Sequence, residues 1–352
     1  MVEQRVTMMH GAGGAVTNDL IKRYILKYLG GGKAEVPLEA LDDAAVIEDI
    51  VLKSDSHAVK PLFFPGGDIG RLAVSGTVND IAVLGAQPLA LTCAFVLEEG
   101  LPIVEFERIV QSMGEACREA DVHVITGDTK VVEKGVLGGC VINTSGIGKR
   151  TRALEHNILV VKKFRPKFSS RWLLDSNLRS GDKIILSGTV ADHGLAVLSS
   201  REGYGFGSKI VSDVAPLNKV VDLLLGKVGG IVAMKDPTRG GLSNALNEWS
   251  QKSKVGILAY EDRIPIRDDV RSACEMLGID PLEVGNEGKI IVGALKEKAE
   301  EALEKLRETS EGKNAQIIGE ATDEFKEVAL ETSVGGKRVL TPPIGDPIPR
   351  IC

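Results

Sequence analysis

The spacing of apolar residues predicts a series of amphipathic helices along the chain. The pattern is clearest over residues 103–120, where Ile103, Phe106, Ile109 and Met113 recur at intervals of three and four and therefore share one helix face. The same spacing predicts a helix over residues 18–29 near the start of the chain. Further helices are expected over residues 68–84, 213–225, 267–277 and 296–308, and two more open at residues 191–194 and 234–242.

Short apolar runs bounded by turn residues predict strands between these helices. The runs lie at residues 41–47, 50–57, 89–97, 122–125 and 136–147 in the first half, and at 182–187, 255–259, 290–294, 315–319 and 328–332 in the second. Because strands and helices alternate in both halves, we expect an α/β protein with mixed sheets. The predicted division is an N-terminal domain at 1–150, a connection at 151–179, a C-terminal domain at 180–340 and a flexible tail at 341–352.

Composition narrows the class of protein. The 352 residues are 43% hydrophobic but only 4% aromatic, with 40 glycines, which is typical of an aliphatic α/β protein with many tight turns. A net charge of −6 does not favour nucleic-acid binding. The longest apolar run, residues 81–97, contains Gln87 and Pro88 and is too short to span a membrane. Five widely spaced cysteines and the lack of a charged-then-apolar leader predict reduced thiols in the cytoplasm.

The tail at residues 341–352 combines four prolines with a cysteine at its last position. Proline fixes φ and removes a backbone donor, so an extended segment is expected here. Two interpretations remain open for Cys352: a chance residue on a frayed end, or a tethered thiol that carries a chemical group into an active site. The neighbouring α-carboxylate disfavours the reactive thiolate, and Arg350 partly offsets that charge.

A glycine-rich loop precedes the first predicted helix. His10, Gly11, Gly13 and Gly14 lie just before residues 18–29, and a flexible loop that leads into a helix start is suited to anion binding. The loop lacks both the P-loop signature and the dinucleotide fingerprint. A plain turn therefore remains the alternative.

Five aspartates lie at or near element boundaries in the predicted N-terminal domain: Asp42, Asp43, Asp55, Asp80 and Asp128. A single aspartate at such a position is usually a helix cap or a turn residue. Carboxylates gathered near a phosphate-binding loop are instead typical of magnesium–nucleotide sites, because magnesium prefers oxygen ligands. Lys130 follows Asp128 closely and is suited to offset charge on a transferring phosphoryl group. The histidines and cysteines do not have the spacing of a zinc site.

The predicted connection at 151–179 is rich in basic residues interleaved with Phe164, Phe168 and Trp172. Such a mixture binds single-stranded nucleic acid in some proteins. We favour the simpler interpretation, a surface connection whose aromatic side chains pack on the domain.

Several motifs together resemble the HypE family of hydrogenase-maturation carbamoyl dehydratases. The motifs are His10–Gly14, Leu41-Asp42-Asp43-Ala44, Ser54-Asp55-Ser56-His57, Phe63–Gly70, Val78-Asn79-Asp80, Gly127-Asp128-Thr129-Lys130, Lys235–Leu242, Asn286-Glu287-Gly288-Lys289 and the terminal Pro349-Arg350-Ile351-Cys352. The acidic motifs and the glycine loop are shared with aminoimidazole ribonucleotide synthetase and selenophosphate synthetase, so they imply ATP use. The terminal motif resembles HypE alone. Residues 151–179 look longer than the usual interdomain connection of the family.

The resemblance implies a two-domain PurM-like ATP-binding fold and a specific reaction. A HypF carbamoyltransferase would load Cys352 with a carbamoyl group, which this enzyme would dehydrate to a thiocyanate with ATP and Mg²⁺. The cyano group would then pass to iron on a HypC–HypD complex as a ligand of the nickel–iron hydrogenase centre. A cytoplasmic homodimer that contacts its neighbour through the N-terminal domains is also implied.

The resemblance also implies roles for individual residues. Asp43, Asp55, Asp80 and Asp128 would hold magnesium and the phosphates, with Asp42 as a further candidate. His10, Gly11, Gly13, Gly14 and Asn79 would close on the nucleotide, and Lys130 would stabilise phosphoryl transfer. Glu287 would accept the amide proton, while Asp236 and Arg239 would anchor the tail or a phosphate. For Glu287, Asp236, Arg239, His57 and His193, ordinary surface, capping or packing roles remain as alternatives.

Two other functions are compatible with the sequence. One is a related enzyme that uses ATP to activate a free small-molecule amide or acid. The other is a non-catalytic carrier that only presents Cys352. The aspartate cluster argues against the carrier, and the terminal cysteine argues against the enzyme with a free substrate.

Overall fold

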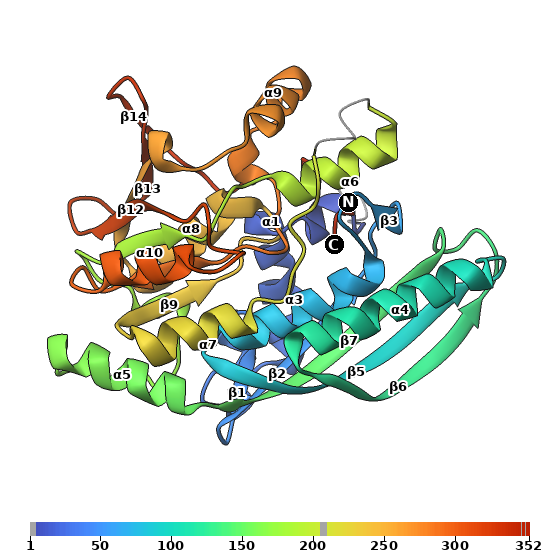
Figure 1. The fold of residues 1–352 in the computed structure, drawn as a ribbon, viewed down its shortest axis with the longest axis horizontal. Helices are drawn as coiled ribbons and strands as arrows, with labels where there is room; N and C mark the ends of the chain where they lie inside the picture. Colours follow the sequence, from blue (N-terminus) through green and yellow to red (C-terminus); the bar gives the residue numbers. More distant parts are fainter. Residues whose placement is uncertain (1–4, 205–209, 346, 349) are drawn as a thin grey trace.

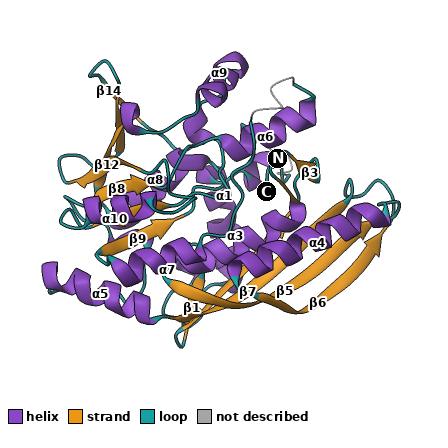
Figure 2. Cartoon of the chain, in the orientation of Figure 1, coloured by secondary structure: helices purple, strands orange, loops and turns teal. Residues whose placement is uncertain are grey.

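The chain forms two α/β domains, each built on one large sheet (Figure 1). The computed structural model describes residues 5–204, 210–345, 347–348 and 350–352. Figure 2 shows the two sheets with helices packed between and around them. Helix assignments from apolar spacing agree well: α4 spans Ile103–Ala120, as the pattern predicts.

The N-terminal sheet has five strands in the order β1-β2-β7-β5-β6. The strands are β1 (Ala45–Ile47), β2 (Ile50–His57), β5 (Ala86–Glu98), β6 (His123–Val132) and β7 (Cys140–Arg150), and a small hairpin, β3 (Phe63–Phe64) and β4 (Gly67–Asp68), lies apart. Helices α3 (Ile69–Val83) and α4 pack on one face of the sheet. Asp68 caps α3 by accepting from the backbone N–H groups of Gly70 and Arg71, as expected for its position.

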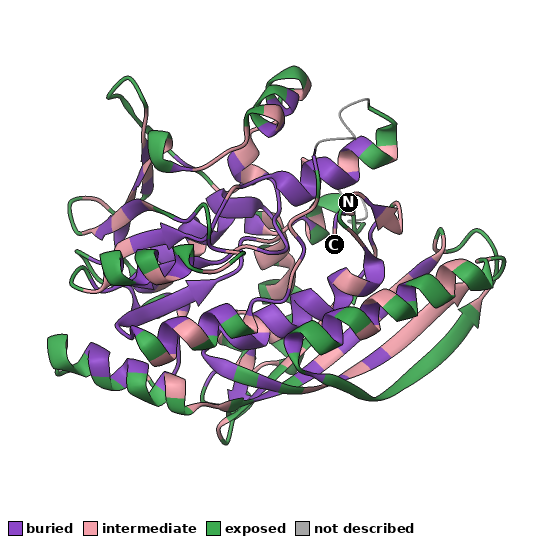
Figure 3. Ribbon diagram, in the orientation of Figure 1, coloured by how far each residue is buried: buried purple, intermediate pink, exposed green. Residues whose placement is uncertain are grey.

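Strand β2 shows how the sheet sorts its side chains. Its residues alternate between the helix-covered face and the open face, so Lys53, Asp55 and His57 lie on the same side as the buried Val51. The open face of the sheet carries exposed apolar side chains such as Ile147. Strand β6 is exposed along almost its whole length, as the green lower strand in Figure 3 shows.

The C-terminal sheet has seven strands in the order β14-β13-β10-β12-β8-β11-β9. They are β8 (Lys183–Leu186), β9 (Ile231–Lys235), β10 (Gly256–Tyr260), β11 (Ile291–Ala294), β12 (Gln316–Thr322), β13 (Val328–Glu331) and β14 (Lys337–Val339). Helix α8 (Gly241–Ser253) packs on one face, while α7 (Asn218–Lys227) and α10 (Ala299–Arg307) cover the other. Strands β9 and β11 are therefore buried throughout, which explains their continuous apolar runs.

The two domains share one hydrophobic core. Ile81 and Val83 of α3 belong to the same buried cluster as Leu224 of α7 and Met234 of β9. Further helices complete the molecule: α5 (Arg152–Phe164), α6 (Asp192–Glu202) and α9 (Asp268–Leu277). None of the helices in the described part of the chain has the length and apolarity that a membrane span requires.

Two expectations about elements were wrong. Strand β6 does not end at residue 125 but continues to Val132, so Asp128 and Lys130 lie within a strand rather than at its end. Pairing with β5 resumes after a register shift at Ile125 and extends the strand through the Gly127 motif. The segment at 151–179 is also not a plain connection, because it begins with the thirteen-residue helix α5, which packs on α7.

The rest of that segment has a buried role. Trp172 is buried and Phe168 packs partly against the core, as expected for a connection that packs on the domain, but Phe164 is exposed. The segment also brings Asp175 into the interior, where its carboxylate accepts a hydrogen bond from Trp249 Nε1 at 2.8 Å. Sequence spacing gave no indication that this aspartate is buried.

The start of the chain folds into one helical stretch of three parts: α1 (Gly14–Leu20), a π-helical turn (Ile21–Ile25) and α2 (Leu26–Leu29). This confirms the helix expected over residues 18–29 and extends it to Gly14. The loop before it lies against the second domain, since a Cβ at Gly13 would lie 3.2 Å from the Arg239 carbonyl oxygen. Gly13 and Gly14 both have positive φ, a conformation that glycine adopts without strain.

Candidate functional site

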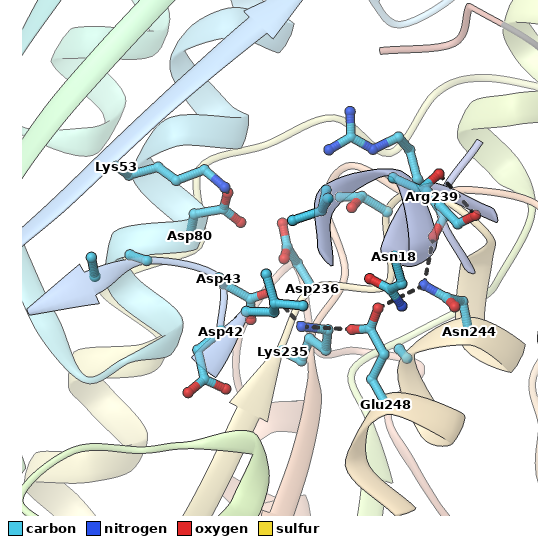
Figure 4. Close-up of a pocket in the computed structure, with 18 of the residues that line it drawn as sticks. Asn18, Asp42, Asp43, Lys53, Asp80, Lys235, Asp236, Arg239, Asn244 and Glu248 are labelled. Atoms are coloured by element: carbon cyan, nitrogen blue, oxygen red, sulfur yellow. Dashed lines mark hydrogen bonds and ion pairs between the residues drawn. The ribbon is translucent and has the colours of Figure 1, made fainter. Parts of the chain in front are cut away.

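A cavity of about 440 Å³ lies where the two domains meet, and Figure 4 shows the side chains that surround it. The N-terminal domain and the helical stretch contribute Gly13, Gly14, Asn18, Asp42, Asp43, Lys53 and Asp80 to its lining. The C-terminal domain contributes Lys235, Asp236, Arg239, Asn244 and Glu248. Glycines of the loop and acidic and basic side chains from both domains therefore face one space.

Three carboxylates converge in this cavity. Asp43 precedes β1, Asp80 lies on α3 and Asp236 follows β9, and one oxygen of each lies within 4.8 Å of the others. Burial raises the pKa of Asp236 to about 7 and also raises the pKa of Asp43 and of Asp80. Burial and mutual repulsion make this arrangement costly for three ionised groups, and a bound cation would relieve the cost. The oxygen donors suit a hard divalent ion such as magnesium.

Lys53 lies beside this trio and was not predicted from the sequence. Its ammonium group pairs with Asp80 and, at 3.2 Å, with Asp55. These two carboxylates hold the pKa of Lys53 above its usual value even though burial opposes the charge. Alternation along β2 gives the missed signal, because Lys53 and Asp55 are two residues apart and must share a face.

A second ion network supports the opposite wall. Lys235 pairs with Asp43, with Asp175 at 3.2 Å and with Glu248 at 3.1 Å. Lys252 also binds Asp175, at 2.7 Å. Burial opposes the charge of Lys235, but Asp175 and Asp43 outweigh it and raise its pKa. Lys235 lines the cavity itself, so the network holds Asp43, one of the three carboxylates, in place at the cavity wall.

The end of the tail lies in a small adjoining cavity. Cys352 lines it together with Asp55, His57, Asp80, Asp236, Arg239 and Glu287. Asp80, Asp236 and Arg239 line both cavities, so the thiol residue and the carboxylate trio share walls. The charge at Cys352 is the largest influence on Arg239 and raises the pKa of that guanidinium. Arg239 therefore offsets the negative charge near the terminal residue.

Glu287 is the buried carboxyl group in the small cavity that is best suited to act as a general base. Its side chain is 3% exposed, and burial, reinforced by the negative charge of Asp213, raises its pKa well above the usual value. Asp213 also accepts a hydrogen bond from the Glu287 backbone N–H at 3.3 Å. A carboxyl group with a raised pKa is a stronger base than an ordinary carboxylate and is suited to accept a proton.

His57 and His193 were both predicted as possible lining residues of the site, but of the two only His57 lines either of these cavities. His57 lines the small cavity, burial lowers its pKa to about 4, and its Nδ1 has no hydrogen-bond partner among the described residues. His193 instead contacts the tail itself, since its Nε2 lies 2.7 Å from the Ile351 carbonyl oxygen.

Other predicted residues lie elsewhere. Asn79 is buried with its amide bonded to the backbone of Ala215, Leu217 and Glu287, so it shapes the loop of Glu287 instead of contacting the cavity. His10 bonds to Thr7 at the surface, and neither His10 nor Gly11 lines the two cavities in the described part of the chain. Asp128 and Lys130 are exposed on β6, outside both cavities of this single chain.

Family models match most of the chain. Residues 41–149 match the N-terminal domain of AIR synthase related proteins, and residues 179–330 match the C-terminal domain. The carbamoyl dehydratase HypE of Azotobacter vinelandii is 44% identical over 99% of this chain and 97% of its own length. The chain belongs to the HypE family of carbamoyl dehydratases. It is therefore an enzyme with the two PurM-like domains that its motifs indicated.

Solved HypE structures have the same fold. The chain of a HypE–HypF complex is 44% identical, with a TM-score of 0.82 over 92% of this chain and 99% of that one. A HypE in complex with ATP is 40% identical, with a TM-score of 0.79 over 99% of this chain and all of that one. The second match covers nearly the whole chain, both domains included.

Proposed function

We propose that this enzyme uses ATP to dehydrate a carbamoyl group carried on the thiol of Cys352, which leaves a thiocyanate on the same sulfur. The product supplies the cyanide ligand for the iron of a nickel–iron hydrogenase. The position of Cys352 carries this proposal: the last residue of the chain lines one cavity with Glu287, and that cavity shares four lining residues, Asp80, Asp236, Thr238 and Arg239, with the carboxylate-lined cavity next to it.

The reaction needs a better leaving group than an amide oxygen. Bound ATP supplies a phosphoryl group for that oxygen, which then departs as phosphate. The carbon–oxygen bond breaks, the nitrogen loses both protons, the sulfur–carbon bond remains, and ADP and phosphate are formed. The chain must hold the amide in line with the nucleotide, offset negative charge and accept protons.

The nucleotide and its metal ion fit the larger cavity. Asp43, Asp80 and Asp236 would hold magnesium, with Asp55 and Asp42 close by, and the ion would bind the phosphates. Gly13 and Gly14 also line this cavity. Lys53 and Lys235 keep two of the carboxylates in place, and Lys53 also offers a positive charge toward the phosphates. The HypE in complex with ATP supports nucleotide binding by this chain.

Proton removal is assigned to Glu287. Its burial and raised pKa suit a general base, and it lines the same cavity as Cys352. Arg239 would hold the terminal carboxylate so that the carbamoyl group, rather than that carboxylate, faces Glu287. His57 is kept neutral by burial and would bound the cavity without adding charge.

Partner proteins follow from the same proposal. A HypF carbamoyltransferase would load the thiol, as the solved HypE–HypF complex supports, and a HypC–HypD complex would receive the cyano group. All five cysteines are free thiols in the structure, which suits the reducing cytoplasm.

We also propose that the enzyme works as a homodimer. The open face of the N-terminal sheet exposes Ile50, Leu52 and Ile147, and a second copy would cover it. Asp128 and Lys130 lie on β6 at the edge of this sheet. They would then serve the nucleotide site of the neighbouring copy rather than their own.

Mass spectrometry of the C-terminal peptide tests the function. After incubation with a carbamoyltransferase, carbamoyl phosphate and ATP, the peptide should carry first a carbamoyl and then a cyano group on Cys352, with one ADP formed per cyano group. Glu287→Gln should accumulate the carbamoylated peptide, and Cys352→Ser should form no thiocyanate.

Two outcomes would contradict the proposal. A Cys352→Ser enzyme that still consumes ATP with a free amide would indicate a related enzyme with a soluble substrate. A carbamoylated tail that never triggers ATP consumption in the unaltered enzyme would indicate a carrier.

A further inference from the structure

The end of the tail is gripped through its backbone. Ala58 donates its N–H to a carboxylate oxygen of the terminal residue Cys352 at 3.2 Å, and Lys60 donates to the Arg350 carbonyl oxygen at 3.3 Å. The Arg350 guanidinium in turn donates to the Ala58 carbonyl oxygen at 3.2 Å. The last three residues therefore pair with residues 58–60 in the manner of a short added strand.

Helix α6 supplies two side chains to the same grip. His193, near its start, contacts the Ile351 carbonyl oxygen at 2.7 Å. Arg201, near its end, donates to the Arg350 carbonyl oxygen at 2.7 Å and to the Lys60 carbonyl oxygen at 2.8 Å. Arg201 thus joins the tail to the strand-like segment beside it.

The chemistry of His193 is fixed by its partners. A carbonyl oxygen only accepts, so Nε2 carries the proton that is donated to Ile351. Nδ1 lies 2.8 Å from Ser212 Oγ and accepts from that hydroxyl. The ring of Phe64 meets the imidazole edge-on at 5.3 Å between centroids and limits its rotation. His193 is therefore a rigid donor with one direction available.

Apolar packing adds a size limit. Ile348 and Ile351 are 0% and 1% exposed and belong to the same buried cluster. Gly285 leaves the space that Ile351 fills, because a Cβ there would lie 2.7 Å from the Ile351 Cδ1 atom. Arg350 has a φ of 59°, so the chain bends sharply just before these last two residues. Only one register of the tail satisfies the bend, the apolar site and the carbonyl contacts together.

We infer that His193 and Arg201 form a latch that holds the docked tail in the register which places the Cys352 sulfur in the small cavity. They are positioning residues, since they hold the tail through its backbone carbonyl groups. The contacts of the latch are independent of the proposed function, but its purpose rests on that function. In the proposed reaction the thiol must leave the cavity to be carbamoylated, return for dehydration, and leave again to deliver the cyano group. A moderate grip of a few hydrogen bonds permits both.

Alkylation of Cys352 tests the latch without ATP. The other four cysteines are buried, so a small alkylating reagent reads out the terminal thiol by mass spectrometry. His193→Ala and Arg201→Ala should each raise the alkylation rate about tenfold, because each removes a hydrogen bond from the docked state. His193→Gln retains a donor of similar reach and should bring the rate back toward that of the unaltered protein.

Matched controls separate the latch from general loosening. His156 contacts the Leu225 carbonyl oxygen and Arg307 donates to the Ala315 carbonyl oxygen, both away from the tail. His156→Ala and Arg307→Ala should leave the alkylation rate unchanged. The latch variants should also slow dehydration of a pre-carbamoylated tail about tenfold while carbamoylation by the transferase is unchanged or faster.

The results separate the two proposals. Unchanged alkylation in Arg201→Ala would overturn the latch, and this variant decides the matter even if His193→Ala fails to fold, because Arg201 is partly exposed. Faster alkylation in the latch variants, with no thiocyanate formed by the unaltered enzyme, would support the latch and overturn the proposed function.

Discussion

The two sheets of this enzyme differ in how many of their faces are buried. The C-terminal sheet is covered on both faces, and its strands β9 and β11 are buried from end to end. The N-terminal sheet is covered on one face by α3 and α4 and leaves the other open. Because only one face of the N-terminal sheet is covered, polar residues of this domain can face either the cavity or the outside of the molecule. Lys53 and Asp55 face inward to the cavity, whereas Asp128 and Lys130 lie on an exposed strand.

The largest expected difference between the two sheets is in the loss of unfolding free energy when a charged residue replaces an apolar one. Ile185→Glu on β8 places a carboxylate in a fully buried position and should cost more than about 4 kcal/mol of unfolding free energy, enough to prevent folding. Ile147→Glu on the open face should cost less than about 1 kcal/mol. Chemical denaturation measures both. Sedimentation should show that Ile147→Glu shifts a dimer toward monomer, and a dimer that persists unchanged would show that this face is not the interface.

Mixing two inactive variants tests where Asp128 acts. Asp80→Asn should reduce ATP consumption on a carbamoylated tail at least a hundredfold while the protein stays folded, and Asp128→Asn should reduce it strongly as well. If Asp128 serves the neighbouring copy, an equal mixture with exchanged subunits has one intact site in half of its dimers. Activity should then recover to about a quarter of the unaltered level.

The mixture also has a clear contrary result. If Asp128 serves the site of its own chain, no subunit in the mixture has both aspartates, so activity stays at the level of the variants alone. Each variant mixed with itself is the control for the exchange procedure.

A smaller effect concerns pH and the inward-facing carboxylates. The pKa of Asp236 is about 7 in the folded protein, above its ordinary value, so the folded state holds a proton that the unfolded state has lost. Its contribution to stability is therefore complete below about pH 4 and is lost as pH rises toward 7. Without metal, unfolding free energy should fall by about 3 kcal/mol across this range relative to Asp236→Asn.

Magnesium should oppose that loss. At pH 8 it should raise the melting temperature of the unaltered protein more than that of Asp236→Asn, because it binds the ionised carboxylates. Equal shifts in the two proteins would show that Asp236 takes no part in holding the ion.

The spacing of apolar residues along the chain predicted much of this fold. Helix α4 has the predicted limits, and the aspartate cap of α3 was apparent from its place before an apolar segment. Asp43, Asp80 and Asp236 lie far apart in the sequence but come together, and each had been singled out from its motif. Local motifs succeed when a residue's surroundings are set by its own element.

The features that the sequence did not predict depend on contacts between segments that lie far apart in the chain. Asp175 is held by Lys235, Lys252 and Trp249, which lie 60 to 77 positions away, so its own neighbours carry no signal. Asn79 was misjudged for the same reason, because its partners are backbone groups of the other domain. The grip of α6 on the tail likewise joins residues about 150 positions apart.

The junction between the domains contains a natural optical reporter. The sequence has two tryptophans, and both are buried: Trp172 on the interdomain segment and Trp249 on α8. The indole of Trp249 is bonded to Asp175, which the cavity residue Lys235 also contacts. Any movement that admits water between the domains should therefore shift the intrinsic fluorescence to longer wavelength, so opening and closing during turnover can be followed without an attached dye.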